Sequence, residues 1–210
     1  MATANTGRTS KASASAKNTA KKEVEVKPVE TVEAAPAAES YPELDLGPVT
    51  GTKVPDNLLV KVRSNVFGGL IYENHRSGEV TEWSNHGDVQ FMTVGELRTM
   101  KAEQSAFFRN QWIVITGVAD GEDSEATCAD IYTALAIKQY YKNYIEPGDF
   151  GALCNIPLDK IEERVSLLSK GQKENLVVAL NEYIASGQLD SIRRIRAFEE
   201  ALGVELLVEN

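Results

Sequence analysis

Two histidines come closest, by type and position, to residues that could carry out acid–base or metal chemistry. His75 and His86 lie in predicted hairpin loops, with Glu73 and Glu82 near the first and Asp88 near the second. An imidazole beside carboxylates can bind a metal ion or move a proton. The spacing matches no metal-ligand motif, and loop histidines among turn residues are more often solvated. We therefore predict no metal site and keep a metal-dependent enzyme only as a third hypothesis.

Other signatures of catalysis are equally weak. Cys128 and Cys154 have no histidine, lysine or arginine as an immediate neighbour, so we expect two small buried side chains and no reactive thiol, disulfide framework or zinc site. The glycine pair Gly68-Gly69 lacks the frame of a phosphate-binding loop, and the sequence contains no GxSxG motif. The sequence predicts a protein that is not an enzyme and takes no cofactor.

Three arginines, Arg193, Arg194 and Arg196, are the sharpest basic feature of the predicted folded part. A short helical bundle that presents such a helix is typical of helix-turn-helix DNA readers. Glu199 and Glu200 follow about one turn later, however, and a pair between Arg196 and Glu200 explains the charge without DNA. An ion-paired, solvated helix face is the preferred interpretation.

Aromatic residues crowd two segments of the predicted folded part. The six residues are Phe107, Phe108, Trp112, Tyr140, Tyr141 and Tyr144. Packing in a core or between domains is the simpler interpretation. Because a small module does not always bury so many rings, we also predict the six as candidate interaction residues.

The composition is that of an acidic protein with a mixed surface. The 210 residues are 42% hydrophobic, 25% charged and 7% aromatic, with a formal net charge of −9. This charge argues against a protein whose whole surface binds nucleic acid. The sequence has no run of about eighteen apolar residues and no apolar signal core at its start. It predicts a soluble protein with neither a membrane span nor a targeting segment.

The first 56 residues differ in composition from the rest. Residues 1–22 contain five basic residues and no acidic one, whereas residues 23–56 contain eight acidic residues and two lysines. No aromatic residue precedes Tyr41, so this segment cannot bury enough apolar surface to fold alone. We predict a disordered tail over 1–56 that orders on a partner, with a plain solubilising tail as the alternative. Its basic block is predicted to allow weak contact with nucleic acid.

Residues 57–120 predict a β-rich module with one helix. Short β-prone runs separated by turn residues indicate an antiparallel meander over 58–92. Thr93 and Glu96 have the spacing of a capping box, which predicts a helix from there to about Asn110. The apolar run from Trp112 to Ile115 predicts a returning buried strand. The acidic loop 121–125 is the candidate domain boundary.

Residues 127–207 predict a helical module, which makes the fold class α+β. A Thr127–Asp130 cap starts a helical stretch that Pro147-Gly148 ends, and a second helix begins at Pro157. The next predicted helix begins with a Ser169–Gln172 capping box and ends at a left-handed Gly187. The last predicted helix begins at the cap residue Asp190 and ends at a left-handed Gly203. Ile192, Ile195, Phe198 and Leu202 are predicted to face inward.

Several segments together resemble uncharacterised structural proteins of tailed bacteriophages. The quoted runs are Leu59 to Arg63, Gly69 to Tyr72, Glu82-Trp83, Gln90 to Leu97, Phe107 to Trp112, Lys138 to Asn143, Leu168 to Gln172 and Gly187 to Ser191. The resemblance covers about residues 57–207 and rests on hydrophobic and turn residues. It implies a virion component without catalytic residues.

These observations predict a non-enzymatic phage structural or assembly protein that binds capsid or head–tail junction subunits. We expect it in the virion, assembled in the host cytoplasm in multiple copies with other virion proteins, and away from membranes. The alternative is a cytoplasmic phage or bacterial regulator that binds nucleic acid or polymerase through the C-terminal helices.

Overall fold

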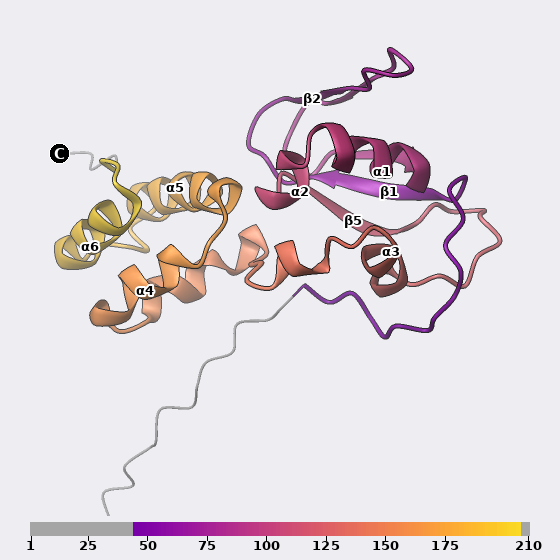
Figure 1. The fold of residues 1–210 in the computed structure, drawn as a ribbon. Coiled ribbons are helices and arrows are strands. Elements are labelled where there is room, and N and C mark those ends of the chain that lie inside the picture. The colour runs from indigo at the N-terminus through magenta and orange to yellow at the C-terminus, as the bar shows by residue number, and fades with distance from the viewer. Residues whose placement is uncertain (1–43, 207–210) are drawn as a thin grey trace, which may run out of the picture. The chain divides into compact units, whose positions relative to one another are not determined.

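The structure is a computed structural model that describes residues 44–206 (Figure 1). The predicted α+β class is confirmed, and most of the predicted tail lies outside the described residues. The elements in chain order are β1 (Leu59–Ser64), β2 (Leu70–Glu73), β3 (Val80–Trp83), β4 (Val89–Thr93), α1 (Val94–Glu103), α2 (Ala106–Arg109), β5 (Ile113–Val118), α3 (Cys128–Ala134), the 3-10 helices η1 (Lys138–Tyr141), η2 (Pro147–Asn155) and η3 (Leu158–Lys160), α4 (Ile161–Ser166), α5 (Lys170–Ala185) and α6 (Ile192–Leu202).

β1 is the central strand of a three-stranded sheet with the order β4-β1-β5, antiparallel to both neighbours. β4 and β5 are therefore parallel to each other, and α1 and α2 make the crossover between them. β2 and β3 form a separate hairpin. The predicted meander is thus wrong in its pairing, because β1 pairs with β4 and β5 and leaves β2 to the hairpin.

The hairpin is attached to the sheet through side chains. The Trp83 indole N–H donates to the Val62 carbonyl at 2.9 Å, and the Gln90 side chain donates to the Glu82 carbonyl at 2.7 Å. Tyr72 packs edge-on against Phe107 of α2, with ring centroids 5.6 Å apart. One face of the hairpin is buried in this way and its other face meets solvent.

Two predicted helices are each divided in the structure. α1 begins with the predicted Thr93–Glu96 capping box, but it ends before Gln104, and α2 follows. α3 begins with the predicted Thr127–Asp130 capping box and ends before Ala136, which has a φ of 50°. The second break leads into η1 and brings Tyr141 to β5 beside Tyr132 of α3.

Those tyrosines cover the edge of β5. The Ile115 N–H donates to the Tyr132 hydroxyl at 3.1 Å, and the Tyr141 hydroxyl donates to the Ile113 carbonyl at 2.6 Å. These backbone groups of Ile113 and Ile115 are satisfied without another strand, which blocks pairing of a further strand at this part of the edge.

The C-terminal helices α4, α5 and α6 enclose a second hydrophobic core together with η2 (Figure 1). Pro147 begins η2, so the prediction that it ends the helical stretch is wrong. Ser169 caps α5 and Gly203 caps α6 in the left-handed region, as predicted. The cap of α6 at its start is Ser191, not Asp190. Ile192, at the first position of α6, is 66% exposed and does not face inward.

The two cores divide between Tyr144 and Ile145. α3 and η1 therefore pack with the sheet, although they follow the predicted boundary at 121–125. Whether either part folds as an independent domain stays a prediction.

Four buried side-chain amides lie where the second core meets the sheet. They are Asn65, Gln111, Gln172 and Asn175, each at most 2% exposed, and we call them the amide seam. The Gln172 side chain bonds both the N–H and the carbonyl of Ile145, at 3.1 and 2.6 Å. It is therefore unavailable for the capping box predicted with Ser169. Asn175 donates to the Asn65 carbonyl at 2.6 Å, and Asn65 donates to the Gln111 carbonyl at 3.1 Å.

Asp130 holds the extended segment that precedes β1. Its carboxylate accepts bonds from the Thr50 hydroxyl at 2.7 Å, from the Thr50 and Gly51 N–H groups, and from Thr127. The hydrogen bond from the Thr50 side chain, together with these others, holds the pKa of Asp130 well below its usual range.

Gly171, next to Gln172 of the amide seam, lies too close to its neighbours to be replaced by a residue with a side chain. A Cβ there would press on the Asn110 carbonyl and on the Trp112 ring 2.8 Å away, so Gly171→Ala is expected to lower the free energy of unfolding by about 1–3 kcal/mol. Gly148→Ala is the matched control, because a Cβ at that position meets nothing within 4 Å. Urea unfolding measures both variants. Equal stability of Gly171→Ala and the parent would contradict the tight packing.

The lowered pKa of Asp130 predicts a pH-dependent stability. The contribution of the Asp130 carboxylate to the free energy of unfolding is complete at pH values above the ordinary carboxyl pKa. It is lost as the pH falls through the lower pKa of this group in the folded state. Asp130→Asn is expected to destabilise the protein at neutral pH, and the difference from the parent should shrink on acidification. Thermal unfolding from neutral to acidic pH measures this, and faster hydrogen exchange at Thr50 and Gly51 should accompany it. A difference independent of pH would overturn the assignment.

Candidate protein-interaction surface

The strands β2, β3 and β4 carry large apolar side chains on their solvent sides. Ile71, Val80, Val89 and Phe91 are 60%, 61%, 43% and 55% exposed. An antiparallel sheet with one face in water normally alternates buried apolar and exposed polar residues. Exposed apolar side chains in consecutive strands are therefore a departure that fits a contact surface.

Strand register defines two such faces, each with two apolar and two charged residues. In the hairpin, Ile71 lies opposite Glu82 and Val80 lies opposite Glu73. Residues opposite each other, or two apart in one strand, share a face. We call these four residues the acidic hairpin face. Both carboxylates are exposed, and within the described residues neither takes part in an ion pair.

The second face lies on the three-stranded sheet. Phe91 is opposite Lys61, and Val89 is opposite Arg63, on the side away from the buried Val62. We call Lys61, Arg63, Val89 and Phe91 the basic sheet face. Lys61 pairs with Asp120 at 2.8 Å, and the side chain of that carboxylate is 90% exposed.

Arg63 joins this face to the second core. Its Nη2 lies 2.8 Å from both carboxylate oxygens of Glu146 and 3.3 Å from the Tyr144 hydroxyl. His86 is close to this pair and stacks on Phe67, with ring centroids 4.5 Å apart. Burial lowers the pKa of His86, and the Arg63 charge lowers it further. The Arg63–Glu146 bridge connects β1 to the chain just before η2, which is a structural role.

The remaining candidates for chemistry do not assemble into a site. Among residues 44–206, no three histidine, cysteine, aspartate or glutamate side chains form a group that could hold a metal ion. His75 is exposed and contacts Gln104. Cys128 and Cys154 are free and half-buried, and burial raises the pKa of both thiols.

The arginines of α6 are divided between two roles. Arg194 donates to the Ile156 carbonyl at 2.6 Å and so holds α6 against the preceding segment. Arg193 and Arg196 are exposed. In the part of the chain that the structure describes, no ion pair joins Arg196 to Glu200, so that predicted pair is wrong.

The six predicted aromatic residues mostly lie inside the molecule. Phe107, Phe108, Tyr141 and Tyr144 are at most 4% exposed and belong to the first core. Trp112 and Tyr140 are half-buried and pack against that core. Core packing, the simpler interpretation, describes them. Four of the exposed large apolar side chains lie instead in β2, β3 and β4, and the others are spread over the loops and the C-terminal helices. The sequence signal for these four was an apolar residue on the solvent side of a short strand whose other side is also apolar.

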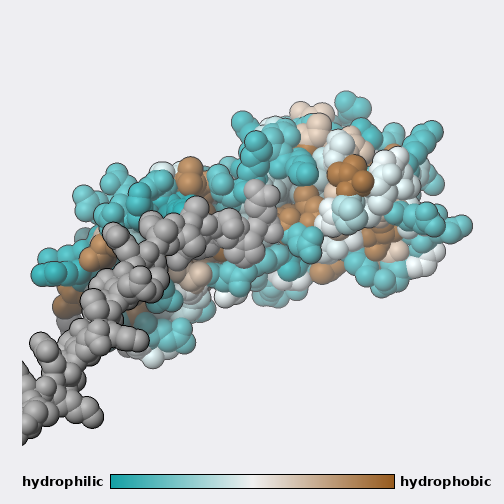
Figure 2. All heavy atoms as spheres, turned by 90° about the horizontal axis from the view of Figure 1, so that it is seen from below, coloured by the Kyte–Doolittle hydropathy of each residue, from teal (hydrophilic) through white to brown (hydrophobic). Residues whose placement is uncertain are grey.

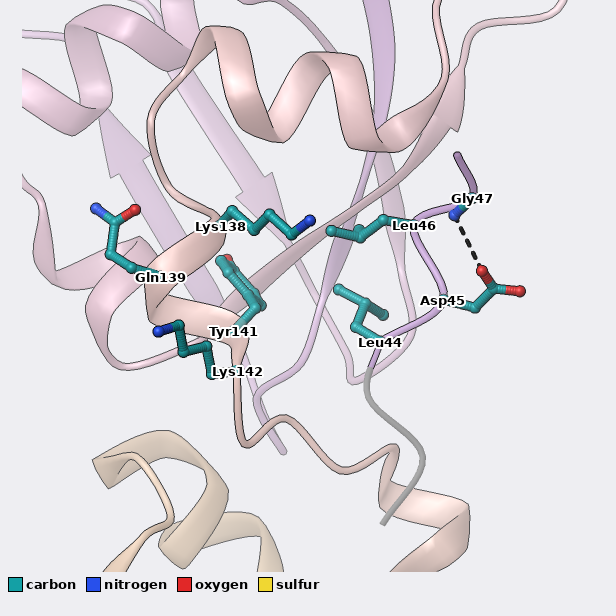
Figure 3. A pocket seen from close by; sticks show the side chains of 8 residues that line it. All are labelled: Leu44, Asp45, Leu46, Gly47, Lys138, Gln139, Tyr141 and Lys142. Carbon is teal, nitrogen blue, oxygen red and sulfur yellow. Dashed lines mark hydrogen bonds between the residues drawn. The ribbon is translucent and has the colours of Figure 1, made fainter. Parts of the chain in front are cut away.

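An open pocket of about 810 Å³ lies between the segment before β1 and η1 (Figure 3). Leu44, Leu46 and Tyr141 face one another there, with Lys138 and Lys142 at its sides (Figure 3). The Tyr141 hydroxyl is already bonded to β5. The pocket therefore offers apolar walls and two exposed lysines, without a set of polar groups that converge on a ligand.

The face seen in Figure 2 carries its hydrophobic residues in separate groups among hydrophilic ones. None of the helices within the described residues is long and apolar enough to cross a membrane.

The surroundings of His86 predict its titration. Its pKa should lie below the ordinary value of about 6.5, so stability falls as the pH drops below that value, because the unfolded chain takes up the proton first. Glu146→Gln should lower this pKa further, since the carboxylate raises it. NMR titration of the imidazole measures both, with Glu79→Gln as a control at an exposed hairpin position. A pKa of His86 above the ordinary value would contradict the described environment.

Comparisons with known proteins add no assignment to this geometry. No family model matches the chain, and neither a curated protein nor a solved structure is significantly similar to it.

Proposed function

We propose that this protein is a non-enzymatic assembly component of a tailed-bacteriophage particle. It binds other virion subunits through the solvent sides of β2, β3 and β4. The observation that carries this proposal is the exposure of Ile71, Val80, Val89 and Phe91 on strands whose other faces are buried. Burial of such side chains against another protein is favourable by roughly 25 cal/mol per Å² of apolar surface.

The charges around these side chains favour a protein partner over nucleic acid. Arg63 is held by Glu146 of the same chain, which reduces its attraction for phosphates. Glu73 and Glu82 would repel phosphates from the hairpin. The regulator alternative relies on α6, where one of the three arginines is bonded to the backbone of the preceding segment.

The virion as the place of action is supported by the resemblance of residues 57–207 to structural proteins of tailed phages. Capsid or head–tail junction subunits are the proposed partners. Contact of the basic block in residues 1–22 with nucleic acid stays a prediction, because those residues lie outside the described part of the chain.

Particle incorporation tests the proposal. Particles purified from producing cells through a density gradient should contain the protein in a fixed ratio to the major capsid protein, measured by quantitative peptide counting. The double variant Val80→Ser and Phe91→Ser should reduce that ratio by about tenfold, since both apolar contacts are lost. Val49→Ser, at a position 54% exposed elsewhere on the molecule, is the matched control and should incorporate normally. Absence of the parent protein from particles would overturn the proposed function.

A further inference from the structure

The two faces carry charged side chains of opposite sign and the same number of apolar residues. Each cation of the basic sheet face is paired with a carboxylate of the same chain. The acidic hairpin face presents Ile71 and Val80 with two carboxylates, and the basic sheet face presents Val89 and Phe91 with two cations. We propose that the acidic hairpin face of one copy docks on the basic sheet face of a second copy. This inference rests on the proposed function and names one partner of the same surface.

The arrangement of charges on the two faces is compatible with sheet packing. The two carboxylates, Glu73 and Glu82, lie diagonally across the hairpin, whereas Lys61 and Arg63 lie along one strand. With strands about 4.8 Å apart and alternate residues about 6.8 Å apart, that diagonal is inclined by about 35° to the strands. Packed sheets cross at about 30°. At that crossing the carboxylates of one copy can follow β1 of the next. Ile71 and Val80 then lie on opposite sides of β1, so one of them meets Val89 and Phe91 on β4 and the other lies toward β5.

The ion pairs already present leave this contact available. Glu73 and Glu82 have no ion-pair partner within residues 44–206. Lys61 is paired with Asp120, but a pair with so exposed a carboxylate contributes little and exchanges readily. Arg63 remains bound to Glu146. Lys61 is therefore the cation that meets the Glu82 carboxylate of the second copy.

A second copy is favoured because each chain carries both halves of the contact. The net charge of −9 opposes unspecific association between copies, so an attractive contact requires a local match of opposite charge. Each face is defined by four residues, whereas a standard protein interface contains about 20–30 residues on each side. A single contact is therefore weak, and it gains strength when copies are arrayed side by side in an assembly.

A charge-swap experiment on the full chain tests this contact. Sedimentation over a concentration series at about 50 mM salt, where surface charges are little screened, should show concentration-dependent self-association of the parent. Lys61→Glu alone and Glu82→Lys alone should each weaken it by about tenfold, because like charges then face each other. An equimolar mixture of the two variants should recover to within about threefold of the parent, because each interface in an alternating assembly again joins opposite charges.

Matched controls change the same charges elsewhere. Arg193→Glu and Glu200→Lys, both at exposed positions of α6, should associate like the parent. Val80→Lys, at a position 61% exposed, is a second variant expected to weaken association without disturbing folding, which circular dichroism verifies. A parent that stays monomeric, or a mixture that fails to recover, overturns self-docking.

Failure of this inference is distinguishable from failure of the proposed function. A monomeric parent that still enters particles in a manner dependent on Val80 and Phe91 leaves the virion function standing, with a different subunit as partner. A parent that self-associates with the charge-swap pattern but is absent from particles supports self-docking and removes the virion function.

Discussion

The bond of the Asn175 side chain to the Asn65 carbonyl is the constraint on which the arrangement of the two cores depends, because it joins α5 of the second core to the end of β1. The Gln172 side chain adds two bonds to the backbone of Ile145. The chain passes from one core to the other at that residue, and its buried peptide groups need partners. The Asn175–Asn65 bond and the close approach of Gly171 to Asn110 fix the same junction. Leaving one of these buried polar groups unpaired costs about 1–3 kcal/mol, so the amide seam is specific as well as cohesive.

The polar groups that would suggest chemistry are mostly used to hold this structure. Asp130 organises the segment before β1, Tyr132 and Tyr141 satisfy the backbone of β5, and Arg63 with Glu146 joins the sheet to the second core. What remains accessible on β2, β3 and β4 is apolar surface beside charges of either sign. Such a surface is suited to contact with protein, which is why assembly is the function that we propose.

The faces proposed to bind are outside the tightly packed regions. Ile71, Val80 and Phe91 occupy the solvent sides of short strands, whereas Tyr72, Trp83 and Met92 on the opposite sides are buried in the first core. Substitutions at the exposed positions therefore change the surface with little effect on folding. This separation lets contact and stability be measured independently.

The sequence by itself determined the features that depend on neighbours in the chain. The capping boxes at Thr93 and Thr127 and the left-handed Gly203 are local hydrogen-bonding and steric effects, and so is the short hairpin. Only the tertiary structure decided the strand order, the breaks near Gln104 and Ala136, and the exposed position of Ile192. The amide seam and the exposed apolar faces also belong to the tertiary structure. Asn65 and Asn175 are 110 positions apart, and the side of a strand that meets solvent is set by what packs on the other side.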